Sequence, residues 1–339
     1  MPLISRKKTI YPVSPTLRQY LRHQKKEVQV AVSYQDLLRY TSTISLYDAH
    51  EKDTLWETLF YAPQEMQEIY TALKKIYALL KAEGELSVIE HLYVDRVDLC
   101  TYGNTQPIRV RIVNRINDNF DYFYVKQADA SRIYGLELED LTSPNRVQHF
   151  VSGQTLIEEH IAGVPGEQFM RRYLNKNLNR TRLAKEFVKF NERCFVRLLG
   201  DMHASNYVVD ITPDFEETHY RIRAIDFDQQ SYEGQKKVYM PKYFKENNPI
   251  IKIGLELMTP ETTRQYQIEE RSMIAHRLRS SYNTVDQLIQ TMRQDQIAPP
   301  ENTYQLKHEL ADYYGLSDFL TCQSMGDLLR MSLKQVFNH

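Results

Sequence analysis

Strand-type periodicity in this chain is concentrated between Gly84 and a Gly-Val-Pro-Gly break at residues 163–166. Alternating and β-branched residues there predict five strands, at residues 88–99, 108–116, 122–125, 147–151 and 155–161. One helix is expected between the third and fourth strands, over residues 130–141, where Ser143-Pro144 would close it. These elements predict a small antiparallel sheet with a single helix.

The two ends of the chain have mainly helical periodicity. Residues 15–84 include apolar positions spaced at three, four and seven, namely Met66, Ile69, Tyr70, Leu73, Ile76, Tyr77 and Leu80. Residues after the break are mainly helical again, except for one short hairpin. We therefore expect an α+β protein of three segments: a helical N-terminal extension (1–84), a small lobe (85–162) and a larger, mainly helical lobe (163–339).

Composition restricts the class of protein and its main partners. The chain has 339 residues, of which 42% are hydrophobic and 26% charged, so it can bury one or two cores. Its net charge of -1 argues against nucleic acid as the main partner. Three widely spaced cysteines form no C-x-x-C pair, and no segment has the pattern of a signal peptide or a membrane span. These features predict a cytoplasmic protein with no transmembrane segment.

The residues that most strongly suggest chemistry lie in and beside the short hairpin that interrupts the helical pattern after residue 166. The sequence reads Gly200-Asp201-Met202-His203-Ala204-Ser205-Asn206, then two apolar segments around a polar turn, and then Ala224-Ile225-Asp226-Phe227-Asp228. One template for phosphoryl transfer has an Asp that faces the attacking hydroxyl, followed five residues later by an Asn and then by a further Asp, whose oxygens bind Mg²⁺. Asp201 alone would be an ordinary loop aspartate, and Asp226 alone an ordinary residue at a strand end. The order of Asp201, Asn206 and Asp226 along the chain is what indicates a site.

This order of motifs resembles the protein-kinase-like superfamily, especially its aminoglycoside and choline phosphotransferase branch. The resemblance covers roughly residues 87–249. It implies a bilobal kinase-like fold, with ATP and Mg²⁺ as cofactors. Asp201 would be the catalytic base, and Asn206 and Asp226 would be metal ligands. Asp228 would bind a second metal or remain a solvated acid, and His203 would support the loop or only hydrogen-bond its backbone.

The resemblance also assigns residues upstream of the hairpin to nucleotide binding. Lys126, at the end of the third predicted strand, would bind the phosphates of ATP. Glu137 is the expected partner of Lys126 because it shares a helix face with apolar residues, and Glu139 is the alternative. The remaining candidates are a turn that would cover the nucleotide and a strand end that would meet adenine through its backbone: Tyr102, Gly103 and Asn104, and Glu159, His160 and Ile161.

Two departures from protein kinases shape the expected function. Leu199 stands where the superfamily usually has His, and Asp228 stands where protein kinases have Gly. The expected activity is transfer of the γ-phosphate of ATP to a hydroxyl of an unidentified acceptor, with a small molecule favoured. The alternatives are an atypical protein or phosphoinositide kinase, an AMP-transferring enzyme, and a nucleotide-binding scaffold that is catalytically silent.

Overall fold

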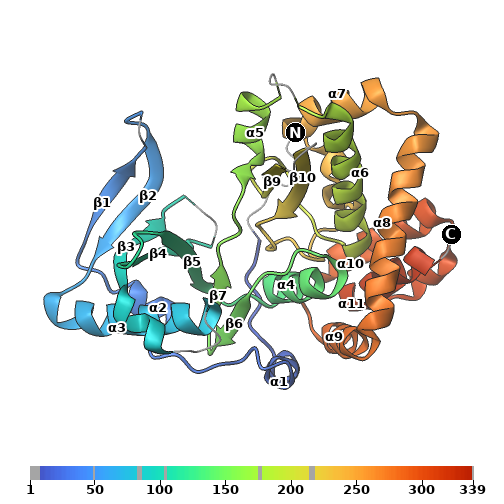
Figure 1. Cartoon of the computed structure of the whole chain (residues 1–339). Coiled ribbons are helices and arrows are strands. Elements are labelled where there is room, and N and C mark those ends of the chain that lie inside the picture. Colours follow the sequence, from blue (N-terminus) through green and yellow to red (C-terminus); the bar gives the residue numbers. More distant parts are fainter. Residues whose placement is uncertain are drawn as a thin grey trace. The chain divides into compact units, whose positions relative to one another are not determined.

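The computed structural model describes residues 8–48, 50–81, 86–102, 105–174, 178–213 and 218–337. The chain forms two compact units, whose elements are labelled in Figure 1. The sheet unit consists of Arg18–Asp129 and Val147–His160. The helical unit consists of the residues up to Leu17, Ala130–Arg146, and the chain from Ile161 onward.

The described part of the sheet unit holds a seven-stranded antiparallel sheet with the order β1-β2-β3-β4-β5-β7-β6. Its strands are β1 (Ser42–Tyr47), β2 (Asp53–Phe60), β3 (Leu92–Cys100), β4 (Ile108–Asn114), β5 (Phe120–Gln127), β6 (His149–Ser152) and β7 (Thr155–Glu159). Its helical elements are α1 (Pro15–His23), which begins in the other unit, α2 (Tyr34–Leu37), α3 (Pro63–Lys81) and the 3-10 helix η1 (Leu86–His91).

Helix α3 packs on one face of this sheet, against β3 and β4 (Figure 1). The core between them contains Phe123 and Val125 of β5 and Ile157 of β7. Because successive strand residues point to opposite faces, Lys126 and Glu158 lie on the other face of the sheet. The alternation of side chains along each strand thus determines which polar residues point away from the core.

The five predicted strands are confirmed as β3 to β7, and the predicted helix is α4 (Ala130–Thr142). One expectation, that of a five-stranded sheet after a helical N-terminal stretch, needs correction. The stretch expected to be helical contains β1 and β2, where Thr43, Ile44 and Thr58 favour extended backbone through their branched side chains. The contacts also place these strands in the same unit as β3, and α4 in the helical unit. The division into segments 1–84, 85–162 and 163–339 stays a prediction.

The helical unit surrounds a small antiparallel sheet with the order β10-β9-β8. The strands are β8 (Val164–Pro165), β9 (Tyr207–Pro213) and β10 (Thr218–Ala224). The helices are α4, α5 (Gly166–Arg172), α6 (Arg180–Arg197), α7 (Asn248–Leu257), α8 (Pro260–Ser280), α9 (Tyr282–Gln294), α10 (Pro300–Tyr314) and α11 (Met325–Lys334). Short 3-10 helices are η2 (Lys236–Tyr239), η3 (Pro241–Tyr243), η4 (Lys245–Asn247), η5 (Ser317–Thr321) and η6 (Gln335–Phe337).

Helix α6 is the centre of this unit, in contact with α7, α8, α11 and β10. Its last turns bury charged residues, which are paired as buried ions must be. Arg193 lies between Glu186 and Glu270, at 2.7 and 3.0 Å. Arg197 pairs with Glu139 of α4, with side chains 2% and 3% exposed, which ties α4 to the end of α6. Within the part of the chain described, no helix is long and apolar enough to cross a bilayer.

Candidate functional site

The loop that carries Asp201 begins where α6 ends. Leu198 caps α6 in the left-handed region, at φ 54°, and turns the chain toward residues 229–238. The amide of Gly200 donates to the carbonyl of Gln229 at 3.1 Å, and the amide of Asp201 donates to that of Val238 at 3.1 Å. The loop is therefore held by backbone hydrogen bonds to two later segments.

Asp201 and Asn206 lie together within this loop. Nδ2 of Asn206 donates to the backbone carbonyl of Asp201 at 2.8 Å and to its Oδ2 at 3.4 Å. Asp201 adopts φ 62°, a left-handed conformation that non-glycine residues rarely take outside functional or tightly constrained positions. The spacing of five residues thus closes a turn that presents the Asp201 carboxylate.

The hairpin brings Asp226 next to this turn. In the β9–β10 ladder Tyr207 is paired with Ala224. One residue beyond, the amide of Ile225 donates to the carbonyl of Asn206 at 3.0 Å. Asp226 is the next residue after Ile225, so the hairpin places the backbone of Asp226 beside Asn206.

The carboxyl group of Asp201 has an unusual proton affinity. Its side chain is 25% exposed. Burial, with the nearby charges of Asp226, Glu233, Glu246 and Asp228, raises its pKa from 3.8 to about 7. Burial and like charges both disfavour an ionised carboxylate. A carboxyl group with a pKa near neutrality can exchange a proton at physiological pH, as a general base must.

His203 lies in the same turn, where its backbone amide donates to the carbonyl of Asp201 at 2.9 Å but its imidazole makes no close contact with the Asp201 carboxylate. Its Nε2 is 4.0 Å from Oδ1 of Asp201, whereas its Nδ1 accepts from the amide of Ser205 at 3.3 Å. Burial lowers the pKa of His203, which favours the neutral ring. The arrangement agrees with a supporting position in the loop.

Arg132 of α4 connects the two acids at the end of the hairpin. Its Nη1 lies 2.8 Å from Oδ1 of Asp226 and 2.8 Å from Oδ1 of Asp228, and its Nη2 lies 3.3 Å from the carbonyl of Ile225. The Arg132 side chain is only 3% exposed. This arginine is a site residue that the sequence reasoning missed.

The residues predicted to hold Mg²⁺ retain suitable oxygens. The amide nitrogen of Asn206 is turned to Asp201, so its Oδ1 is the atom turned away from that contact. Oδ1 of Asp226 accepts from Arg132 and from the amide of Asp228, whereas Oδ2 accepts no hydrogen bond within the described residues, and the side chain is 35% exposed. These two hard oxygens fit Mg²⁺ that also binds phosphate. No group of three or more His, Cys, Asp or Glu side chains gathers as a metal site among the described residues.

Lys126, in the sheet unit, is buried in an ion pair. Its Nζ lies 2.9 Å from Oε2 of Glu158, with side chains 9% and 5% exposed. Glu158 on β7 is thus a partner of Lys126 that the sequence analysis did not name, and the expected pairing of Lys126 with Glu137 stays a prediction. The alternative, Glu139, pairs with Arg197 instead. Helix periodicity indicates which face of α4 is buried, but not which strand residue lies beside Lys126, so it could not have identified Glu158.

The other predicted nucleotide ligands differ in how far the structure describes them. Gly103 and Asn104 lie outside the described residues, and Tyr102 beside them is 70% exposed. The amides of Glu159 and His160 already donate within the sheet, to the carbonyls of Gln148 and Tyr122 at 2.9 and 3.3 Å. Backbone recognition of a base at this strand end would therefore rely on the carbonyls and on Ile161. These assignments stay predictions.

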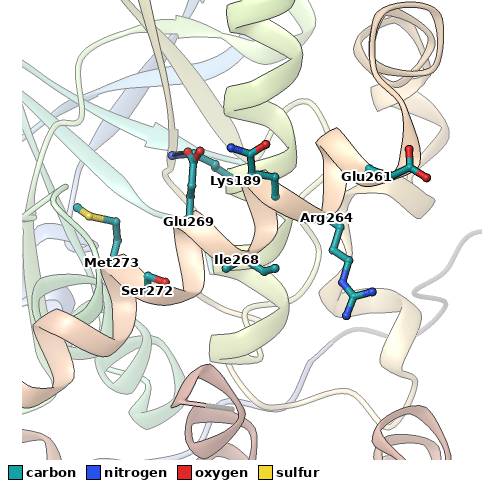
Figure 2. Close-up of a pocket in the computed structure, with 8 residues that line it drawn as sticks. Lys189, Glu261, Arg264, Ile268, Glu269, Ser272 and Met273 are labelled. Atoms are coloured by element: carbon teal, nitrogen blue, oxygen red, sulfur yellow. Dashed lines mark ion pairs between the residues drawn. The ribbon is translucent and has the colours of Figure 1, made fainter. Parts of the chain in front are cut away.

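A separate open depression of about 630 Å³ lies along α8 and α6 (Figure 2). It is lined by Lys189 of α6 and by residues of α8, among them Glu261, Arg264 and Met273. Glu269 pairs there with Lys189 at 3.0 Å. None of the predicted site residues lines this depression, so we do not treat it as the functional site.

Glu158 and Arg132, which the sequence analysis did not name, differ in whether the sequence contains a signal for them. Glu158 alternates with the apolar residues of its strand, and would be found by anyone who knew that β7 pairs with β5. Arg132 has no such signal, because a single arginine in the first turn of a helix is usually solvated. Its role depends on how α4 packs against the segment after β10.

No family profile matches the chain, and no curated protein is similar to it in sequence. Among solved structures, it is similar to the autoinhibited serine kinase domain of the giant muscle protein titin, with 14% identity and a TM-score of 0.28, over 72% of this chain and 92% of that one. A structure of titin kinase and its flanking domains gives 14% identity and a TM-score of 0.28, over 72% of this chain and 54% of that one. We base no assignment on a likeness of this size.

Proposed function

We propose that this protein is an ATP- and Mg²⁺-dependent phosphotransferase of kinase-like fold, which moves the γ-phosphate of ATP to a hydroxyl group. The observation that carries the proposal is the carboxyl of Asp201, whose pKa is raised to about 7 and whose loop is bonded to Asn206. A solvated loop aspartate would have neither property. The position of Asp226 also supports the proposal, because the preceding residue, Ile225, donates its amide to the carbonyl of Asn206.

In the proposed reaction, Asp201 orients the acceptor hydroxyl and takes its proton as transfer proceeds. The hydroxyl oxygen forms a bond to the γ-phosphorus, the bond from that phosphorus to the bridging oxygen breaks, and ADP leaves with the electron pair. Asn206 and Asp226 would hold Mg²⁺, which supplies positive charge for the phosphate oxygens. Lys126, oriented by Glu158, would bind phosphate of the same nucleotide.

The assay that tests this function uses ATP labelled in the γ-phosphate. Wild type should transfer label, with Mg²⁺ present, to one member of separate panels of small alcohols, proteins and phosphoinositides, and the panel that accepts it identifies the acceptor class. Asp226→Asn should lower the transfer strongly, whereas Asp210→Asn, on β9 of the same hairpin, is the matched control and should not. Equal transfer by wild type and Asp226→Asn would contradict the proposal.

The remaining alternatives separate in the same experiment. Intact-mass measurement of the product shows whether phosphate or AMP has been added. A protein that retains ATP without transferring or hydrolysing it would be a nucleotide-binding scaffold, and this outcome would reject the proposed activity.

A further inference from the structure

The two carboxylates at the end of β10 already share a cation that belongs to the protein. The guanidinium of Arg132 lies 2.8 Å from Oδ1 of both Asp226 and Asp228. In this ion triad, Arg132 is 3% exposed and Asp228 16% exposed, so the cation and one of its two acids are largely desolvated, whereas Asp226 is 35% exposed. Charged hydrogen bonds of this kind are shorter and stronger than neutral ones.

The position of Arg132 is fixed by the packing of α4. The hydroxyl of Ser131 donates to the carbonyls of Asp228 and Gln230, at 3.2 and 2.7 Å. Gly135 lies so close to Phe227 that an added Cβ would come within 2.9 Å of the Cβ of Phe227. Helix and acidic segment are therefore in contact on both sides of Arg132, which has little freedom to leave the triad.

The charges within the triad determine what it can bind. Two carboxylates and one guanidinium leave a net charge of about -1, and Asp228 directs its Oδ1 to Arg132. Asp226 combines a guanidinium-bound Oδ1 with an Oδ2 that accepts no hydrogen bond among the described residues. With two negative charges and no arginine, the same pair would attract a further divalent cation, because electrostatic attraction rises with the uncompensated charge.

We propose that Arg132 is a positioning residue that fills, with a fixed protein cation, the place of a second metal ion between Asp226 and Asp228. The site then binds one divalent cation, at Asp226 and Asn206, and Asp228 is not a metal ligand. This inference rests on the proposed function because it takes ATP as the nucleotide. The expected number of bound metal ions does not depend on phosphate transfer.

The test counts Mn²⁺ ions bound per chain in the presence of a non-hydrolysable ATP analogue, from the electron paramagnetic resonance signal of free Mn²⁺. Wild type should bind one Mn²⁺ ion per bound analogue, and Arg132→Gln should bind two. Arg132→Lys should bind one, because it keeps the charge. Arg293→Met, which removes an arginine that pairs with Asp327, is the matched control and should also bind one.

A further variant, Asp228→Asn, keeps the inference open to refutation if Arg132→Gln does not fold. Asp228→Asn alone should still bind one Mn²⁺ with affinity within about threefold of wild type; a tenfold or larger loss would make Asp228 a metal ligand and overturn the inference. Where Arg132→Gln folds, adding Asp228→Asn should return the count from two to one. An unchanged count in Arg132→Gln would also overturn it.

The same measurements separate this inference from the proposed function. A wild type that binds Mn²⁺ in these ratios but transfers no phosphate would reject the activity and keep the role of Arg132. A wild type that transfers phosphate, while Arg132→Gln binds one ion, would keep the activity and reject the role of Arg132.

Discussion

The helical unit contains Asp201, Asn206 and Asp226, the sheet unit contains the ion pair of Lys126 with Glu158, and these two groups were predictable to very different degrees. Asp201, Asn206 and Asp226 lie within 26 positions of one another, and short backbone bonds within the hairpin join their segments. Lys126 instead pairs with Glu158 on a strand that enters the sheet out of sequence order. Local spacing therefore predicted the first group, whereas the partner in the second depended on tertiary structure.

The strongest test of this comparison is removal of the Asp201 carboxylate. Asp201→Asn keeps the size of the side chain but not the base, so the rate of phosphate transfer should fall by about 10²–10⁴-fold. The measurement is initial transfer from labelled ATP, with circular dichroism to verify folding. Asp210→Asn serves again as the control, and a fall in both variants would indicate damage to the hairpin instead of loss of a base.

The second prediction concerns pH, since the pKa of Asp201 is raised to about 7. Only the ionised carboxylate accepts a proton, so the rate should drop about tenfold for each pH unit below 7 and level off above it. A profile that stays flat between pH 5 and 7 would exclude Asp201 as the base.

The same shift has a consequence for stability. The folded protein binds more protons at Asp201 than the unfolded chain between the ordinary pKa of 3.8 and about 7, so the free energy of unfolding falls as pH rises through this window. Asp201→Asn removes that cost, and should raise the melting temperature more at pH 8 than at pH 5. An equal change at the two pH values would mean that the carboxyl titrates normally.

These examples show which parts of the structure could be read from the sequence. Strands β3 to β7 and helix α4 were predicted because their own residues have the required periodicity. Strands β1 and β2 were not predicted, because they directly precede α3, which has a strong helical pattern. Arg132 and Glu158 were not predicted for another reason. Each contacts residues of a segment distant in the sequence, and periodicity does not indicate which segments pack together.

The fourth prediction compares the two candidate partners of Lys126. Glu158→Gln leaves the buried ammonium without its counterion, so the KM for ATP should rise about tenfold and the free energy of unfolding should fall by about 3 kcal/mol. Glu137→Gln is the matched variant, and should change the KM for ATP less. The measurements are ATP titration of the transfer rate and denaturant unfolding; a larger KM effect in Glu137→Gln would return the partner role to the helix.

The smallest expected effect comes from the contact that sets the position of α4. Gly135→Ala adds a Cβ that would lie 2.9 Å from the Cβ of Phe227 and 3.2 Å from that of Gln230, so α4 and the acidic segment must separate slightly. Overpacking of this kind costs about 1–3 kcal/mol. Because the displaced segment holds Asp226, the transfer rate should also fall, by about two- to threefold.

Gly254→Ala, in α7, is the control for the general effect of replacing a helical glycine. Its added Cβ meets only the end of the Met258 side chain, at 3.1 Å, and the gain in helix propensity is about 0.5–1 kcal/mol. The melting temperature should therefore fall in Gly135→Ala and stay or rise in Gly254→Ala. If both variants behave alike, the close packing of α4 on Phe227 does not position the acids, and the cluster depends on the hairpin alone.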